Sequence, residues 1–293
     1  MAAPVKRAML IAGATASGKS QRALEIAREN KGVIINADAM QVYRELAILT
    51  ARPSAADEAV APHRLYGHVP AAESYSVARW LADATAAMEA VWSAGRVPVV
   101  VGGTGLYFRA LEEGLVAIPA IAPAIRERWR DEFLSKGSMH LHGVLEKLNQ
   151  AEARRLNPGD GQRIVRALEV LEATGRSLEE WQEEAQLVAP MAGVAAQRIL
   201  IEVPRAELYE RAERRLDQMV ATGALDEVKR LIALKLNPAL PAMKAIGVPE
   251  FSAHLRGETS LAEALVSAKT ATRHYIKRQL TWWRHQLPFW RDG

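Results

Sequence analysis

Uniformly apolar runs alternate with amphipathic segments along the first third of the chain. Three short runs, at residues 8–12, 33–37 and 97–101, are apolar at nearly every position. Such runs are typical of strands buried on both faces of a parallel sheet. Helices are predicted between them, one from about Gly18 to about Asn30 and one that begins after Ser76 and ends at Gly95. Strands that alternate with helices in this way predict a doubly wound α/β sheet.

The alternation stops in the middle third of the chain. Between about residues 119 and 190 the pattern predicts helices only, one of which carries Ile125, Trp129 and Phe133 on one face. A strand pattern returns at 198–203, and a long helix follows the Ser260–Glu263 capping box. We therefore predict an α/β core, formed by residues 1–116 and 193–293, that is interrupted by a helical insertion at 117–192.

The amino-acid composition excludes several kinds of site and of protein. The 293-residue chain is 49% hydrophobic, carries a net charge of +4 and contains no cysteine. The lack of cysteine excludes disulfides, thiolate metal sites and cysteine nucleophiles, and it suits a cytoplasmic enzyme. No apolar run approaches the roughly 20 residues of a membrane span, so no membrane segment is expected.

The C-terminal segment mixes basic and aromatic residues. Its basic residues permit a polyanionic partner, whereas its large aromatic side chains are expected to pack on the core rather than to stack on bases. The basic residues are Arg273, Lys277, Arg278, Arg284 and Arg291, and the aromatic ones are Trp282, Trp283, Phe289 and Trp290.

A phosphate-binding loop follows the first predicted strand. Residues 13–20 match G-x-x-x-x-G-K-[ST] between a strand and a helix, where backbone N–H groups and the helix N-terminus attract phosphate oxygens. Lys19 is expected to neutralise the outer phosphate, and Ser20 to offer its hydroxyl to Mg²⁺. The motif predicts a diphosphate or triphosphate ligand without choosing between them. Its residues are Gly13, Ala14, Thr15, Ala16, Ser17, Gly18, Lys19 and Ser20.

Asp38 is the candidate for acid–base chemistry. The strand at 97–101 ends in Gly102-Gly103-Thr104 and carries no acid, unlike the second strand of motor ATPases and GTPases. Asp38 follows the strand at 33–37 at the sheet edge where open α/β proteins bind ligands. It could be a general base, as in small-molecule kinases, or only a capping carboxylate. These residues alone leave both interpretations open.

Five segments, in the same order along the chain, closely resemble the bacterial tRNA dimethylallyltransferases. They are Gly13–Ser20, Asn36–Tyr43, Val101–Tyr107, Asp160–Val170 and Lys277–Arg284. The chain departs from the family pattern at Ala14, Ala39, Arg64 and Val248, none of which is assigned a chemical step.

The resemblance implies a P-loop NTPase-like core, a helical insertion that contacts tRNA and a cytoplasmic, monomeric enzyme that uses Mg²⁺. It implies transfer of a dimethylallyl group from dimethylallyl diphosphate to the exocyclic amine of the adenosine 3′-adjacent to the anticodon, in the anticodon stem-loop of tRNA. The family's base corresponds to Asp38, with Thr104 and Lys19 also catalytic and Arg215 near the diphosphate. The residues expected to contact tRNA are Asp38, Ala39, Met40, Gln41, Thr104, Arg126, Gln162, Arg163, Ile164, Val165 and Arg166.

An ATP-dependent P-loop kinase that acts on a small molecule is the competing hypothesis. Asp38 and the phosphate loop fit it equally well. It leaves the helical insertion and the basic C-terminal segment without a role.

Overall fold

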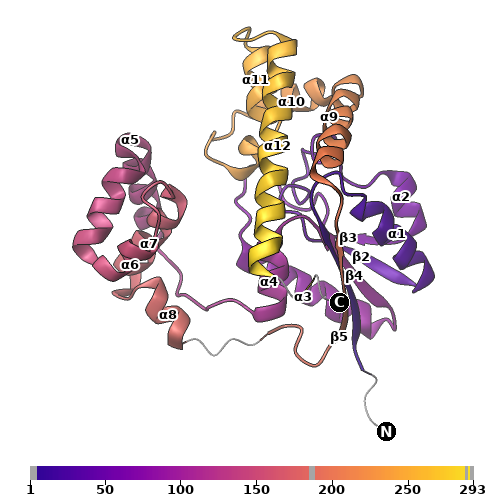
Figure 1. The fold of residues 1–293 in the computed structure, drawn as a ribbon, viewed down its shortest axis with the longest axis horizontal. Coiled ribbons are helices and arrows are strands. Elements are labelled where there is room, and N and C mark those ends of the chain that lie inside the picture. Colours follow the sequence, from indigo (N-terminus) through magenta and orange to yellow (C-terminus); the bar gives the residue numbers. More distant parts are fainter. Residues whose placement is uncertain (1–4, 185–188, 288–289, 291–293) are drawn as a thin grey trace. The chain divides into compact units, whose positions relative to one another are not determined.

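The chain forms two compact units in the computed structural model, which describes residues 5–184, 189–287 and 290. The first unit consists of Met1–Glu113 and Ala189–Gly293, and the second is Gly114–Val188 (Figure 1). The second unit therefore interrupts the first in sequence.

A five-stranded parallel sheet is the centre of the first unit (Figure 1). Its strand order is β3-β2-β4-β1-β5, with parallel pairing at every contact. Every position of β2, and every position of β1 after Arg7, is buried, which explains why these strands read as continuous apolar runs. The predicted parallel α/β sheet is confirmed. The strands are β1 Arg7–Gly13, β2 Gly32–Asn36, β3 His63–Arg64, β4 Val97–Gly102 and β5 Ala195–Ile201.

Helices cover both faces of this sheet. Helix α1, Lys19–Glu29, packs its apolar side on the face formed by Met9, Ile11 and their neighbours. Helices α3 (Val77–Ser93), α4 (Gly105–Glu113) and α12 (Leu261–Gln286) contribute to the core on the opposite face. The predicted caps at both long helices are present, because Ser76 accepts from the backbone N–H of Arg79 and Ser260 forms a capping box with Glu263.

The side chain of Trp80 is a feature of α3 that the sequence analysis did not identify. It is fully buried and stacks on Tyr107, with ring centroids 4.2 Å apart and planes inclined by 10°. Its indole N–H donates to the carbonyl oxygen of Asn36 at 2.8 Å. Trp80 therefore ties α3 and α4 to the end of β2.

The aromatic residues near the C-terminus pack as predicted. Trp283 and Trp290 are 3% and 2% exposed, and both rings lie within 5.5 Å of the Phe108 ring, centroid to centroid. They belong to the core of the first unit. Phe289 and Arg291 lie outside the described residues.

Further helices complete the first unit between β5 and α12, in a region where the sequence pattern had not resolved individual elements. Helix α12 contacts α9 and α11, which lie beside its upper part (Figure 1). They are α9 Arg205–Ala221, α10 Ala224–Ala233, the 3-10 turn η1 Pro241–Lys244 and α11 Val248–Leu255; the earlier α2 spans Ala55–Val60.

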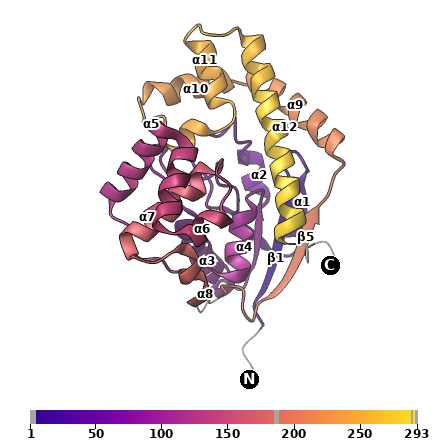
Figure 2. The same cartoon turned by 60° about the vertical axis from the view of Figure 1, so that its left-hand side comes forward.

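The second unit is helical in its described residues (Figure 2). Its core surrounds the fully buried Leu141, Leu145 and Ile164. Gly137 interrupts the first helix at φ 78° and ψ 174°, a positive-φ conformation that glycine adopts readily. The helices are α5 Pro123–Leu148, α6 Gln150–Arg155, α7 Gly161–Thr174 and α8 Leu178–Glu184. Across the described part of both units, no helix combines the length and the apolarity needed to cross a bilayer.

Candidate functional site

The phosphate-binding loop joins β1 to α1. Gly18, the N-cap of α1, has φ 89° and supplies no side-chain cap, and the first turn of α1 carries no acid. The backbone N–H groups of that turn and the positive end of the helix are therefore available to an anion. A Cβ at Gly13 would lie 2.6 Å from the Ser17 hydroxyl oxygen, so the tight loop requires glycine there.

The Ser17 hydroxyl supports a ligand in this loop. Ser17 is 4% exposed, and its hydroxyl has no hydrogen-bond partner within the described part of the chain. A buried polar atom without a partner is costly, and a bound phosphate oxygen would relieve that cost.

Two cations lie beside the loop. The Lys19 ammonium donates to the carbonyl oxygen of Ala14 at 3.2 Å, and the Arg215 guanidinium, from α9, donates to the Thr15 hydroxyl at 2.5 Å. Burial lowers the pKa of Lys19 to about 8; the Asp38 carboxylate opposes this shift and the Arg215 cation adds to it. Burial also lowers the pKa of Arg215, again against the influence of Asp38. This region therefore holds positive charge that is poorly solvated, which favours an anionic ligand.

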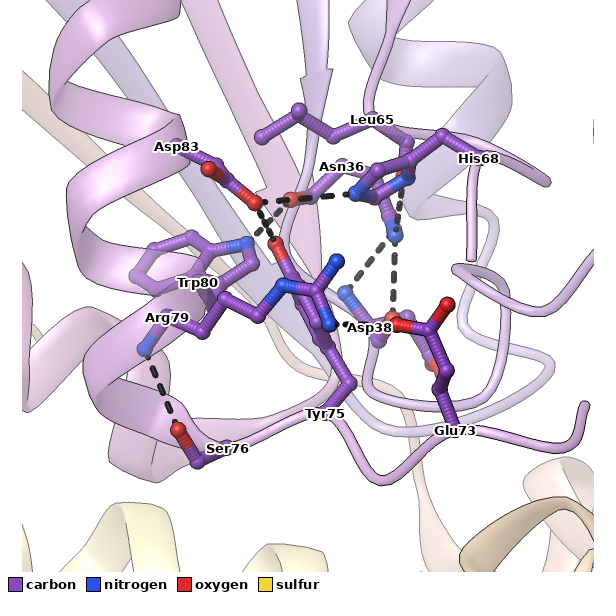
Figure 3. Close-up of polar contacts among 10 residues, drawn as sticks. All are labelled: Asn36, Asp38, Leu65, His68, Glu73, Tyr75, Ser76, Arg79, Trp80 and Asp83. Carbon is purple, nitrogen blue, oxygen red and sulfur yellow. Dashed lines mark hydrogen bonds and ion pairs between the residues drawn. The ribbon is translucent and has the colours of Figure 1, made fainter. Parts of the chain in front are cut away.

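Asp38 follows β2 on a braced segment of backbone (Figure 3). The Asn36 side chain accepts from the Asp38 N–H at 2.8 Å and donates to the carbonyl oxygens of Asp38 and Leu65 at 2.9 and 3.0 Å. The Trp80 indole N–H, which donates to the backbone carbonyl oxygen of Asn36, holds this residue from the other side. The carboxylate is therefore positioned by buried neighbours rather than by a flexible loop.

One carboxylate oxygen of Asp38 has a local role. Oδ1 accepts from the Met40 N–H at 2.9 Å, which is the capping interaction that the sequence left open. Oδ2 takes part in no hydrogen bond within residues 5–184, 189–287 and 290, and it remains free to accept a proton from a ligand. The capping and general-base interpretations of Asp38 are thus compatible.

Thr104 comes from the end of β4, next to β2 in the sheet. Its hydroxyl accepts from the Ala39 N–H at 2.9 Å, and its own N–H donates to the Ala37 carbonyl at 3.1 Å. Tyr275 lies in the same pocket as Thr104, and the pKa of its phenol is raised by burial and by Asp38. The bonds of Thr104 require close contact between β4 and β2, because a Cβ at Gly102 would lie 2.0 Å from the Ala37 carbonyl oxygen.

A pocket of about 360 Å³ brings these groups together. Its polar side contains the loop hydroxyl of Thr15, the Arg215 guanidinium and the Asp38 carboxylate, and its apolar side includes Leu49 and Leu216. This size and mixture are typical of a small-molecule or nucleobase site. The other lining residues are Ala39, Met40, Thr50, Thr104, Ala212, Met219, Lys244, Ala245, Ile246, Thr272, Tyr275 and Arg278.

Ser20 and Gln41 lie outside the lining of this pocket. Ser20 is exposed at the start of α1 and borders a smaller hollow of about 120 Å³ with Arg52 and Tyr66. The Gln41 amide nitrogen donates to the carbonyl oxygens of Thr50 and Ala51 at 2.8 and 3.0 Å, so its side chain is engaged with the protein.

The remaining residues expected to contact RNA lie in the second unit. Arg126, Gln162 and Arg163 are exposed, and Arg166 is partly exposed in an ion pair with Glu169 at 3.4 Å. Ile164 and Val165 are 0% and 8% exposed in the core of that unit, so their side chains are not available to a ligand. The polar face of α7 is thus formed by Gln162, Arg163 and Arg166.

Gln279 is a residue of the site that sequence reasoning missed. It is 5% exposed on α12, and its side chain accepts from the Thr15 N–H and donates to the Gly103 carbonyl, both at 2.9 Å. It lies inside the 277–284 segment that carried the family resemblance, which was the available signal. No such local signal marks Leu49, Lys244 or Tyr275, which reach the pocket only through tertiary folding.

Comparisons with known proteins identify relatives of this chain over nearly its whole length. The family model described as IPP transferase matches residues 41–286, and an isopentenyl transferase model matches residues 6–68. A protein named tRNA dimethylallyltransferase from Chelativorans sp. (strain BNC1) is 53% identical over 98% of both chains. Its counterpart in Mesorhizobium japonicum is 54% identical over 98% of this chain and 89% of that protein.

Solved structures extend the likeness to the fold. The tRNA isopentenylpyrophosphate transferase of Bacillus halodurans has a TM-score of 0.68 and 33% identity, covering 96% of this chain and 88% of that one. A eukaryotic dimethylallyltransferase acting on tRNA has a TM-score of 0.83 and 28% identity, covering 98% of this chain and 72% of that one. The predicted P-loop NTPase-like fold and the predicted family are confirmed. This chain belongs to the IPP transferase family.

Proposed function

We propose that this protein transfers a dimethylallyl group from dimethylallyl diphosphate to the exocyclic amine of the adenosine 3′-adjacent to the anticodon in tRNA. The adenine nitrogen forms a bond to C1 of the allyl group, the C1–O bond breaks, pyrophosphate leaves with the bonding electrons, and the amine loses a proton. The observation that carries this proposal is the single pocket that holds the Asp38 carboxylate together with Thr15 and Arg215 from the diphosphate side. Membership of the IPP transferase family supports it.

The leaving group needs positive charge. Lys19, Arg215 and the N–H groups at the start of α1 can take up the charge that grows on pyrophosphate, and preorganised electrostatics of this kind is usually the largest catalytic contribution. The partly buried, poorly solvated state of both cations strengthens their attraction to the diphosphate.

The acceptor needs a base, because the lone pair of an exocyclic adenine amine is delocalised into the ring. Asp38 Oδ2 is the proposed acceptor of the proton, held in place by Asn36 and by the Met40 N–H. Thr104, fixed by Ala39, is proposed to line the base side of the pocket. The target adenine must leave its stack to enter.

A divalent cation fits the phosphate side. In the described residues no group of three or more acidic, histidine or cysteine side chains could form a protein metal site. Mg²⁺ suits this situation, because it is commonly held by substrate phosphates, water and few protein ligands. We propose that the Ser20 hydroxyl holds Mg²⁺ next to the diphosphate, where the ion would supply charge neutralisation.

The anticodon stem-loop is the proposed macromolecular partner. Arg126, Gln162, Arg163 and Arg166 are proposed contacts from the insertion, here taken as residues 117–192. We place the enzyme in the cytoplasm, with its substrate, and propose that it acts as a monomer.

Donor specificity separates this proposal from a kinase. With Mg²⁺ and unmodified tRNA, dimethylallyl diphosphate should release pyrophosphate and leave the prenyl group on RNA, as followed by a labelled allyl group. ATP should compete for the loop, which recognises phosphate oxygens, without yielding ADP. ADP formation coupled to phosphorylation of a small substrate, with no labelled RNA, would establish the kinase instead.

Lys19→Ala should lower turnover by about 10²-fold or more, since it removes a donor aimed at the leaving group. In the wild type, Lys19 has a pKa of about 8 and is charged at lower pH. Its contribution to pyrophosphate affinity is therefore complete below that pH and is lost as the pH rises through about 8. Calorimetry at several pH values should show this component in the wild type and not in the variant. Equal pH profiles in the two proteins would contradict the role of Lys19.

Asp38→Asn keeps the shape of the side chain and removes its basicity. Single-turnover prenyl transfer should slow by roughly 10²-fold, the scale of a lost general base, with tRNA affinity nearly unchanged. An unaltered single-turnover rate would mean that Asp38 serves only as a cap for Met40.

Arg166→Ala should weaken tRNA binding and make its salt dependence shallower by about one unit, if the contact is to phosphate. Arg154→Ala is the matched control, an exposed arginine on α6 of the same unit. If tRNA affinity depended on salt in the same way for both variants, Arg166 would be an ordinary solvent-exposed residue without a contact to RNA.

A further inference from the structure

A buried carboxylate on α10 holds a loop of the reaction pocket. Glu227 is 3% exposed. Its Oε1 accepts from the N–H groups of Ala47 and Ile48 at 2.7 and 2.8 Å, and its Oε2 accepts from the N–H of Leu49 at 2.9 Å. Within the described residues no lysine, arginine or histidine forms an ion pair with it. The negative charge is therefore met by three successive backbone amides, in charge-assisted hydrogen bonds.

The loop that Glu227 holds is a tight turn. The Ala51 N–H donates to the Ile48 carbonyl and the Arg52 N–H to the Ala47 carbonyl, both at 2.9 Å. Ala51 has φ 50°, a left-handed conformation that a residue other than glycine adopts at a cost. Such a conformation persists only when its surroundings determine it, so the turn depends on outside partners.

Gln41 supplies the partners on the opposite side of the turn. Its amide nitrogen donates to the carbonyl oxygens of Thr50 and Ala51 at 2.8 and 3.0 Å. Glu227 thus holds the N–H groups of the turn and Gln41 holds its carbonyl groups. Because Gln41 lies three positions after Asp38, the turn is coupled to the segment that carries the proposed base.

The turn forms part of the pocket wall. Leu49 and Thr50 line the pocket together with Asp38, Ala245 and Ile246. The Leu49 side chain packs against Gly247, since a Cβ at Gly247 would lie 2.7 Å from Leu49 Cδ2. Within the described part of the chain, no hydrogen bond joins this turn to the phosphate loop, whose contacts run instead to Arg215 and Gln279.

We propose that Glu227 is a positioning residue for the acceptor: through three backbone amides it fixes the 47–51 turn, so that Leu49 and Thr50 form the wall against which the target base is aligned with Asp38. This inference rests on the proposed function. It assigns to α10, which lies outside the pocket lining, control of acceptor alignment but not of diphosphate binding.

Glu227→Gln tests the inference. It replaces one carboxylate oxygen, which accepts from the backbone, by an NH₂ group, so that a donor faces a backbone N–H and the hydrogen bond is lost. The kcat/KM for tRNA should fall by about tenfold or more, as expected for a misaligned reactant, while the affinity for pyrophosphate stays within about twofold. Asp226→Asn, an exposed neutralisation one residue away on the same helix, is the matched control and should behave as the wild type. If Glu227→Gln lowered kcat/KM for tRNA and the affinity for pyrophosphate by the same factor, and lowered the folded fraction to match, the inference would be overturned.

Two further measurements locate the effect. Hydrogen exchange of the folded proteins should accelerate at the amides of Ala47–Leu49 in Glu227→Gln, with the 13–20 loop unchanged; this readout needs no activity. Leu49→Ala, which alone should lower kcat/KM for tRNA, should lose less when combined with Glu227→Gln than the two separate effects predict. Unchanged exchange, or additive losses, would overturn the positioning role. Wild-type protein that transfers no prenyl group would instead contradict the proposed function, whatever the exchange result.

Discussion

The side-chain amide of Gln279 connects three distant parts of the first unit. It accepts from Thr15 in the phosphate loop and donates to Gly103 at the end of β4, while its own backbone belongs to α12. A Cβ at Gly103 would lie 2.4 Å from the Gln279 amide nitrogen, so the approach also requires glycine. Because Thr104 follows Gly103 and Tyr275 precedes Gln279 by one helical turn, this amide links the phosphate loop to the segments that carry Thr104 and Tyr275.

The charges of the site form one coupled set. The Asp38 carboxylate influences the pKa of Lys19, Arg215 and Tyr275, so a change in its charge alters the pKa of all three groups. Two cations face one carboxylate before a ligand binds. A bound diphosphate would neutralise the two cations, so the site attracts an anion.

Local motifs made much of the site predictable from sequence. The phosphate loop and Asp38 each follow a strand, and neighbouring parallel strands deliver their carboxyl ends to one edge, so strand pattern and motif together placed them, whereas Thr104 was selected by the family resemblance. Leu49, Lys244 and Glu227 carry no local signature, because their roles arise from α10, η1 and the 47–51 turn folding against segments far away in sequence. On α7 the residues expected to contact RNA instead included some whose side chains are buried. Ile164 and Val165 belong to the matching segment for packing reasons, while the polar face lies on their neighbours.

The position of the insertion has a consequence for synthesis. β1 lies between β4 and β5 in the sheet, yet β5 begins only at Ala195, and α12 with Gln279 follows later still. A ribosome that has made the phosphate loop and Asp38 must still make the entire helical unit before β1 gains its second neighbour. One flank of β1 therefore stays open during translation, and the helical unit, whose core draws only on its own residues, is the first part able to fold completely.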